Sequence, residues 1–242
     1  MIVSFVQTKG GTGKSTLSMN TAFSSAVAER FSSIALVELD PQGTLQSWWQ
    51  NRTEEAREQG KVSFHHISST QKEVVQEGIS SIASHNELLI LDIPGESTSR
   101  LHTKFACAFS DIVVIPMRTS TNDENAFRDN LLPVIRDLLK VSSDKKGSFQ
   151  ILPSFTNSQS SKKKIIDYFI EILPEYIGCL DEVYPSRSIY ENFNRDGMNL
   201  IEYTESLKNN KRAYAQAQKA VEDIENIATA IFQLREKQNG ST

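Results

Sequence analysis

The chain has 242 residues, of which 38% are hydrophobic and 23% charged, and its formal net charge at pH 7 is −4. This composition is typical of an ordinary globular protein and excludes a disordered or fibrous chain. The slightly acidic balance also argues against the general basic surface of a constitutive nucleic-acid binder, so any such site must be a local patch.

The two cysteines, Cys107 and Cys179, have no C-x-x-C spacing and predict neither a disulfide framework nor a zinc site. No stretch approaches the roughly 18 apolar residues of a membrane span, and the N-terminal apolar run is too short for a signal peptide. We therefore expect a cytoplasmic protein.

Short apolar runs alternate with helical patterns along the chain. The runs predict strands at 2–6, 34–39, 62–67, 88–93, 111–117 and 149–152. The helical patterns lie near 14–29, 70–84, 97–109 and 122–140, followed by one long helix at about 205–237. This alternation predicts an α/β fold with a doubly wound, mainly parallel sheet flanked by helices, and we expect one domain over 1–242. Ligands of such sheets bind beyond the carboxyl ends of the strands.

A glycine-rich loop lies between the first predicted strand and the first predicted helix. The glycines at positions 10, 11 and 13 allow backbone N–H groups to close around phosphate oxygens, and the following helix offers its N-terminal amides to the same anion. Lys14 would reach the β- and γ-phosphates, and the Ser15 hydroxyl would ligate Mg²⁺. The alternative is a glycine turn that binds nothing. The predicted nucleotide-binding residues are Lys9, Gly10, Gly11, Thr12, Gly13, Lys14, Ser15 and Thr16.

Residues 9–16 resemble the deviant Walker A motif, K-G-G-x-G-K-[ST]-[ST], of the ParA/MinD group of ATPases. The resemblance implies a P-loop NTPase fold, ATP and Mg²⁺ as cofactors, and a slow ATPase activity. It also implies that Lys9 crosses an ATP-dependent homodimer to reach the nucleotide of the other subunit. Lys9 and Lys14 are therefore both predicted to be catalytic.

Two carboxylate elements follow the loop. Four apolar residues deliver Asp92 to the end of a strand before Pro94 and Gly95, which is the pattern of a Walker B aspartate that holds Mg²⁺ together with Ser15. The segment from Glu38 to Gly43 resembles the D-x-D-P-Q-G element of the family. By this resemblance Asp40 orients the attacking water, and Glu38, in place of the more common aspartate, is a further candidate for the metal.

Later segments extend the resemblance over roughly residues 1–235. Residues 110–117 resemble the A-D-x-[VI]-[VI]-[VI]-P segment of the family, and 183–197 resembles its late segment with an arginine, an aromatic residue and a glycine. The residue that contacts the base is left open, with Asn157 as one candidate.

The chain begins directly with its first strand, which favours the small ParA proteins without an N-terminal helix-turn-helix. The resemblance implies plasmid or chromosome partition: an ATP dimer binds DNA non-specifically on the nucleoid, and a centromere-binding, ParB-like partner stimulates hydrolysis and releases it. The predicted DNA contacts are Lys211, Arg212, Lys208 and Arg187, with Arg195 and Lys162–Lys164 as further candidates.

Three alternative functions differ from DNA partition in class. A cargo-positioning or DNA-transfer accessory ATPase that acts through a protein partner is compatible with the sequence. A MinD-like membrane ATPase is disfavoured, because residues 231–242 have little apolar mass for an amphipathic anchor. An electron carrier is set aside, because Cys107 lies in a helical stretch without a cluster-binding setting.

Overall fold

The computed structural model describes all residues except 59, 96–99, 143–144, 146–147, 158 and 240–242, and it leaves the side chains of 235–239 undescribed. Its strands are β1 (Ile2–Phe5), β2 (Ile34–Glu38), β3 (Val62–His66), β4 (Leu88–Asp92), β5 (Ile112–Met117), β6 (Phe149–Thr156), β7 (Gly178–Cys179) and β8 (Tyr184–Pro185). They form a sheet in the order β3-β2-β4-β1-β5-β6-β7, with β8 paired to β6. Every pairing is parallel.

The helices are α1 (Lys14–Ala22), α2 (Ser25–Ala28), α3 (Thr44–Gln50), α4 (Glu54–Glu58), α5 (Lys72–Ala83), α6 (Arg100–Phe109), α7 (Thr121–Ala126), α8 (Leu132–Val141), α9 (Lys162–Ile172), α10 (Leu200–Ser206) and α11 (Lys211–Asn239). A π-helical segment, η2 (Phe127–Leu131), joins α7 to α8, and a 3₁₀ turn, η4 (Ser188–Glu191), follows β8. Ser120 caps α7, and Asn199 and Glu202 form a capping box at the start of α10.

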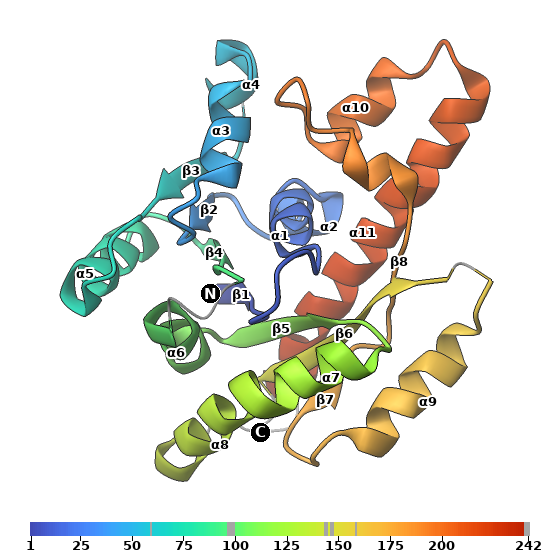
Figure 1. Ribbon diagram of the computed structural model, residues 1–242. Coiled ribbons are helices and arrows are strands. Elements are labelled where there is room, and N and C mark those ends of the chain that lie inside the picture. The colour runs from blue at the N-terminus through green and yellow to red at the C-terminus, as the bar shows by residue number, and fades with distance from the viewer. Residues whose placement is uncertain (59, 96–99, 143–144, 146–147, 158, 240–242) are drawn as a thin grey trace.

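Helices cover both faces of the sheet (Figure 1). One core contains Leu17 of α1, Leu45 of α3 and Ile227 of α11, and the other contains Val75 of α5 and Ile135 of α8. Alternate residues of β4 enter opposite cores: Leu88 and Ile90 face the first core while Leu89 and Leu91 face the second. The predicted doubly wound, mainly parallel α/β fold is therefore confirmed.

The sheet order fixes where a ligand can bind. The chain leaves β1 toward one edge through β2 and β3, returns through β4, and then crosses β1 to continue through β5 and β6. Strand β1 thus lies between β4 and β5, at the point where the direction of winding reverses. Ligands of open α/β sheets bind beyond the carboxyl ends of the strands at such a point.

Several element boundaries differ from those predicted. The helix predicted over 14–29 is divided into α1 and α2, and the helix predicted over 122–140 contains a π-helical segment. The long C-terminal helix begins at Lys211 instead of 205, because α10 and a turn precede it. Helices α3, α4 and α9 and the short strands β7 and β8 were not predicted. Residues 97–99 of the predicted helix 97–109 lie outside the described part of the chain.

Among the described residues, no helix is both long enough and apolar enough to cross a membrane.

Replacing Ile227 by alanine tests the packing of α11. Its side chain is fully buried in the first core, so Ile227→Ala should lower the free energy of unfolding by about 2–5 kcal/mol through lost transfer energy and a new cavity. The matched control is Ile170→Ala on α9, where 60% of the residue is exposed and the change should stay within about 0.5 kcal/mol. Equilibrium unfolding in urea measures both, and equal midpoints would contradict the packing.

Candidate nucleotide-binding site

The glycine-rich loop connects the end of β1 to the start of α1, as the sequence predicts. Gly11 and Gly13 have φ values of +69° and +84°, in the left-handed region that favours glycine. A Cβ at Gly13 would lie only 2.8 Å from a ring carbon of Tyr184. Gly13 is also the N-cap of α1, so the loop passes directly into the positive end of a helix dipole. The loop therefore has the form of an anion-binding cradle.

Lys14 points into this cradle. Lys14 is only 7% exposed, and burial lowers the pKa of its ammonium group. The nearby carboxylates of Asp92 and Asp40 oppose this effect. Gly95, which follows β4, packs closely on the lysine, since a Cβ at that position would lie 2.7 Å from Lys14 Nζ. A buried cation within reach of the loop amides is suited to bind phosphate oxygens.

Asp92 ends β4 beside the loop, as predicted. Ser15 Oγ donates a hydrogen bond of 2.6 Å to its Oδ2, and Ser18 Oγ donates one of 3.3 Å to its Oδ1. Burial raises the pKa of Asp92 to about 7, although the Ser15 hydrogen bond and the charge of Lys14 lower it.

The paired oxygens of Ser15 and Asp92 fit Mg²⁺. This ion prefers hard oxygen ligands and is bound in phosphate-processing sites by one or two side chains together with substrate phosphates and water. The described residues accordingly contain no cluster of three or more His, Cys, Asp or Glu side chains that would hold a metal alone. Ser15 and Asp92 would hold the ion, and its chemistry would be charge neutralisation on the phosphates.

Glu38 lies at the end of β2, paired in register with Asp92, but its carboxylate faces a helix end. Both oxygens accept backbone N–H groups at the start of α3, from Leu45 and Gln46, each at 2.8 Å. Burial raises the pKa of Glu38, and the two amides oppose that rise. The structure thus places Glu38 as the anchor of α3. Its predicted contact with the metal stays a prediction, and both oxygens already have partners.

Asp40 follows β2 in the loop before α3 and is half-buried. Its Oδ1 accepts the backbone N–H of Gln42 at 2.9 Å, and its backbone carbonyl lies 3.0 Å from Nε2 of His66. Its charge acts on both Lys14 and Asp92, so the carboxylate belongs to the same electrostatic group. The sequence did not indicate His66, which fixes the turn that carries Asp40.

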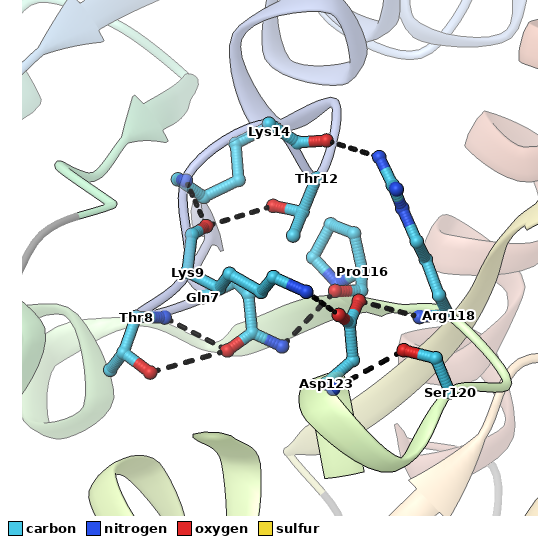
Figure 2. Close-up of polar contacts among 10 residues, drawn as sticks. Gln7, Thr8, Lys9, Thr12, Lys14, Pro116, Arg118, Ser120 and Asp123 are labelled. Atoms are coloured by element: carbon cyan, nitrogen blue, oxygen red, sulfur yellow. Dashed lines mark hydrogen bonds and ion pairs between the residues drawn. The ribbon is translucent and has the colours of Figure 1, made fainter. Parts of the chain in front are cut away.

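Lys9 extends away from Lys14. Its Nζ forms an ion pair with Oδ1 of Asp123 at the start of α7, as Figure 2 shows. The side chain of Asp123 is fully buried, whereas that of Lys9 is 38% exposed. The loop therefore presents two lysines in different environments, one inside the cradle and one at its rim.

A cavity of about 340 Å³ lies beside the phosphate-binding loop. It is lined by residues 11–16 of the loop and by Phe155, Tyr184, Ser186, Arg187, Tyr190 and Glu191. Asn157, the candidate contact for the base, does not line it. The end of β6 contributes Phe155 instead, a residue whose φ of +52° is unusual for a side chain other than glycine.

The predicted DNA-binding residues do not form one patch. Lys211 and Arg212 are exposed at the start of α11, and Lys208 lies close by in sequence, paired with Glu205. Arg187 instead lines the cavity and pairs with Asp223, which accepts from its Nη2 at 3.0 Å. Asp223 lies 12 residues along α11 from Lys211, or about 18 Å at the helical rise.

The site combines a strand, a glycine-rich loop with an interior lysine, a helix and a buried aspartate on the adjacent strand. These features together define a P-loop nucleotide-binding protein. The chain belongs to the CobQ/CobB/MinD/ParA nucleotide-binding domain family, and the match to this family covers residues 3–239. No curated protein matches the sequence.

Solved structures resemble the chain over most of its length at low sequence identity. The MinD cell division protein of Aquifex aeolicus is 15% identical with a TM-score of 0.63, covering 96% of this chain and 97% of MinD. A ParA family ATPase of Chlorobium tepidum is 16% identical with a TM-score of 0.54, covering 94% and 98%. Cobyrinic acid a,c-diamide synthase of Mycobacterium smegmatis, solved with ADP and magnesium, is 14% identical with a TM-score of 0.56, covering 80% and 91%. The nucleotide-binding description of the family agrees with the predicted nucleotide cofactor.

Lys14→Ala tests the cradle. The variant should lose at least about 100-fold in affinity for Mg²⁺-ATP, or about 2.8 kcal/mol, because Lys14 is the cation buried inside the loop. Lys140→Ala on α8, whose side chain is 67% exposed, is the matched control and should bind normally. Titration calorimetry measures both, and cooperative unfolding of Lys14→Ala shows that the fold is kept. Unchanged affinity would place the nucleotide elsewhere.

Proposed function

We propose that the protein is a ParA-like ATPase that acts as one domain in DNA segregation, and that ATP-dependent dimerisation gates its binding to DNA. The observation that carries this proposal is the different placement of the two lysines of the phosphate-binding loop. Lys14 is buried in its own cradle, whereas Lys9 lies at the rim and is partly exposed. This division supports one lysine for the subunit's own nucleotide and one for the nucleotide of a second copy.

Hydrolysis is proposed to depend on Asp40. Its carboxylate lies within the electrostatic reach of Lys14 and Asp92, in a turn held at both ends: His66 contacts its carbonyl and Glu38 anchors the helix that follows. In this position Asp40 would orient a water for attack on the γ-phosphate, and Lys14 would stabilise the charge that develops on the phosphate oxygens. The result is a slow ATPase.

DNA binding is proposed to rest on Lys208, Lys211 and Arg212. Dimerisation would bring two copies of this small basic patch onto one ligand, and the doubled number of phosphate contacts makes affinity rise steeply. A ParB-like protein would then stimulate hydrolysis and release the dimer from the nucleoid. Arg187 is a weaker candidate than the other three, because Asp223 neutralises its charge beside the cavity.

The alternative is an ATPase of the same family that positions a cargo other than a plasmid or chromosome through a protein partner. The specific observation that favours it is the small size of the basic patch on a chain of net charge −4. A MinD-like membrane ATPase is a weaker alternative.

Binding to random-sequence duplex DNA tests the proposed function. Binding should require ATP, should fail with ADP or without nucleotide, and should weaken steeply over a salt series. Lys211→Ala/Arg212→Ala should reduce the affinity about tenfold or more and flatten the salt slope by about the number of phosphate contacts removed. Fluorescence anisotropy of a labelled duplex measures both.

The matched control for this double variant is Arg128→Ala/Lys140→Ala, which removes the same charge from exposed positions of η2 and α8. It should bind DNA as the wild type does. Absence of DNA binding in the wild type with every nucleotide would reject DNA segregation and favour the cargo-positioning alternative.

Asp40→Ala tests the proposed catalytic role. The variant should bind ATP with nearly unchanged affinity, lose about 100-fold or more of its hydrolysis rate, and remain on DNA after ATP addition because the dimer cannot reset. Phosphate release and DNA dissociation rates measure this, with Asp137→Ala, 73% exposed at its side chain, as the control. Equal hydrolysis by Asp40→Ala and the wild type would exclude Asp40 as the residue that activates water.

A further inference from the structure

Arg118 makes a contact with the phosphate-binding loop that the proposed function does not use. It follows the last residue of β5, and its Nη2 donates a hydrogen bond of 2.7 Å to the backbone carbonyl of Gly11 (Figure 2). Its guanidinium lies over the ring of Phe155, with 4.1 Å between Cζ and the ring centroid. Arg118 therefore lies between the loop and the aromatic wall of the cavity.

The space beside Gly11 is open, and Arg118 makes a directional contact to the peptide that follows it. Gly11 has a φ of +69°, and a Cβ at this position would meet no atom within 4 Å, so neighbouring side chains do not fix it by packing. In a trans peptide the carbonyl of Gly11 and the N–H of Thr12 point in opposite directions. Holding the carbonyl toward Arg118 thus turns the Thr12 N–H to the other side of the loop, whereas a flipped peptide would present an oxygen to the phosphates.

Two further features hold Arg118 in place. Phe155 has a left-handed backbone with φ of +52°, and its ring packs edge-on against Tyr184 at 5.6 Å between centroids. The backbone N–H of Arg118 donates to Oδ2 of Asp123 at 3.2 Å, and the same carboxylate binds Lys9. The segment from Arg118 to Asp123 therefore holds the loop at two points, one at Gly11 and one at Lys9.

Stability alone does not account for this arrangement. Nε of Arg118 is buried and has no hydrogen-bond partner among the described residues, and an unsatisfied buried donor is unfavourable for folding. The position is more consistent with a role in shaping the loop for its ligand.

We infer that Arg118 is a positioning residue that keeps the Gly11–Thr12 peptide oriented to bind nucleotide phosphates, with Phe155 as its platform. The inference rests on the proposed nucleotide-binding role of this loop. Arg118 acts through the backbone of Gly11.

The test compares Arg118→Ala, Arg118→Lys and the control Arg128→Ala, an exposed arginine of η2. Affinity is measured for Mg²⁺-ADP and Mg²⁺-ATP with fluorescent analogues, and KM and kcat are measured for ATP hydrolysis. Arg118→Ala should bind both nucleotides about tenfold more weakly, a loss that corresponds to about 1.4 kcal/mol, with KM raised by the same factor and kcat changed little. Arg118→Lys should recover only part of the affinity, because lysine keeps the charge but lacks the planar guanidinium that stacks on Phe155.

Addition of millimolar guanidinium ion should restore affinity to Arg118→Ala and leave Arg128→Ala unchanged, an effect that a loss of fold would not give. Equal nucleotide affinity of Arg118→Ala and the wild type would overturn the inference and leave the proposed function standing. Conversely, if the wild type binds ATP but does not bind DNA, the proposed role in DNA segregation is rejected. In that case, weaker nucleotide binding by Arg118→Ala still supports the positioning role of Arg118.

Discussion

The hydrogen bond between Ser15 and Asp92 is the interaction on which the site depends. It joins the first turn of α1 to the end of β4, two elements that are adjacent only because the sheet places β4 beside β1. The carboxylate is buried, so its charge must be balanced locally, and the charge of Lys14 opposes the effect of burial on its pKa. The phosphate-binding loop, the helix dipole and the acidic strand end are thus parts of one electrostatic arrangement, and a change in the register of β4 on β1 would separate them.

Much of this could be predicted from the sequence, because the signals are local. The apolar run at 2–6 leads into the glycine-rich loop and the run that begins at Leu88 delivers Asp92, and a parallel sheet brings such strand ends to one edge. Glycines at 11 and 13 stand where the backbone needs φ above zero, and Lys14 and Ser15 open the helix at the required place. Neither the spacing nor the residue types depend on distant contacts, so the fold class, the cradle and Asp92 followed from pattern alone.

The rest depends on contacts between residues far apart in the chain. Lys9 and Asp123 are separated by 114 positions, and Arg118 and Gly11 by 107, so no local pattern connects them. Glu38 shows a related difficulty: the resemblance to the family's D-x-D-P-Q-G element makes it a candidate for the metal, but only the structure reveals that two amides of α3 occupy its oxygens. Arg187 and Lys211 are both basic and late in the chain, which predicts that both contact DNA. In the structure, Arg187 instead pairs with Asp223, which lies in the middle of α11.

The position of Asp223 on α11 also has a mechanical meaning. Helix α11 contacts the nucleotide cavity through Arg187 and begins at the exposed residue Lys211, and it packs along its length on α10 and the first core. With about 18 Å between Asp223 and Lys211, a tilt of α11 by roughly ten degrees about Asp223 would displace Lys211 by about 3 Å, comparable to the length of a hydrogen bond. Because both sites lie on one helix, any rearrangement at Arg187 that tilted α11 would also move the proposed DNA-binding residues at its start.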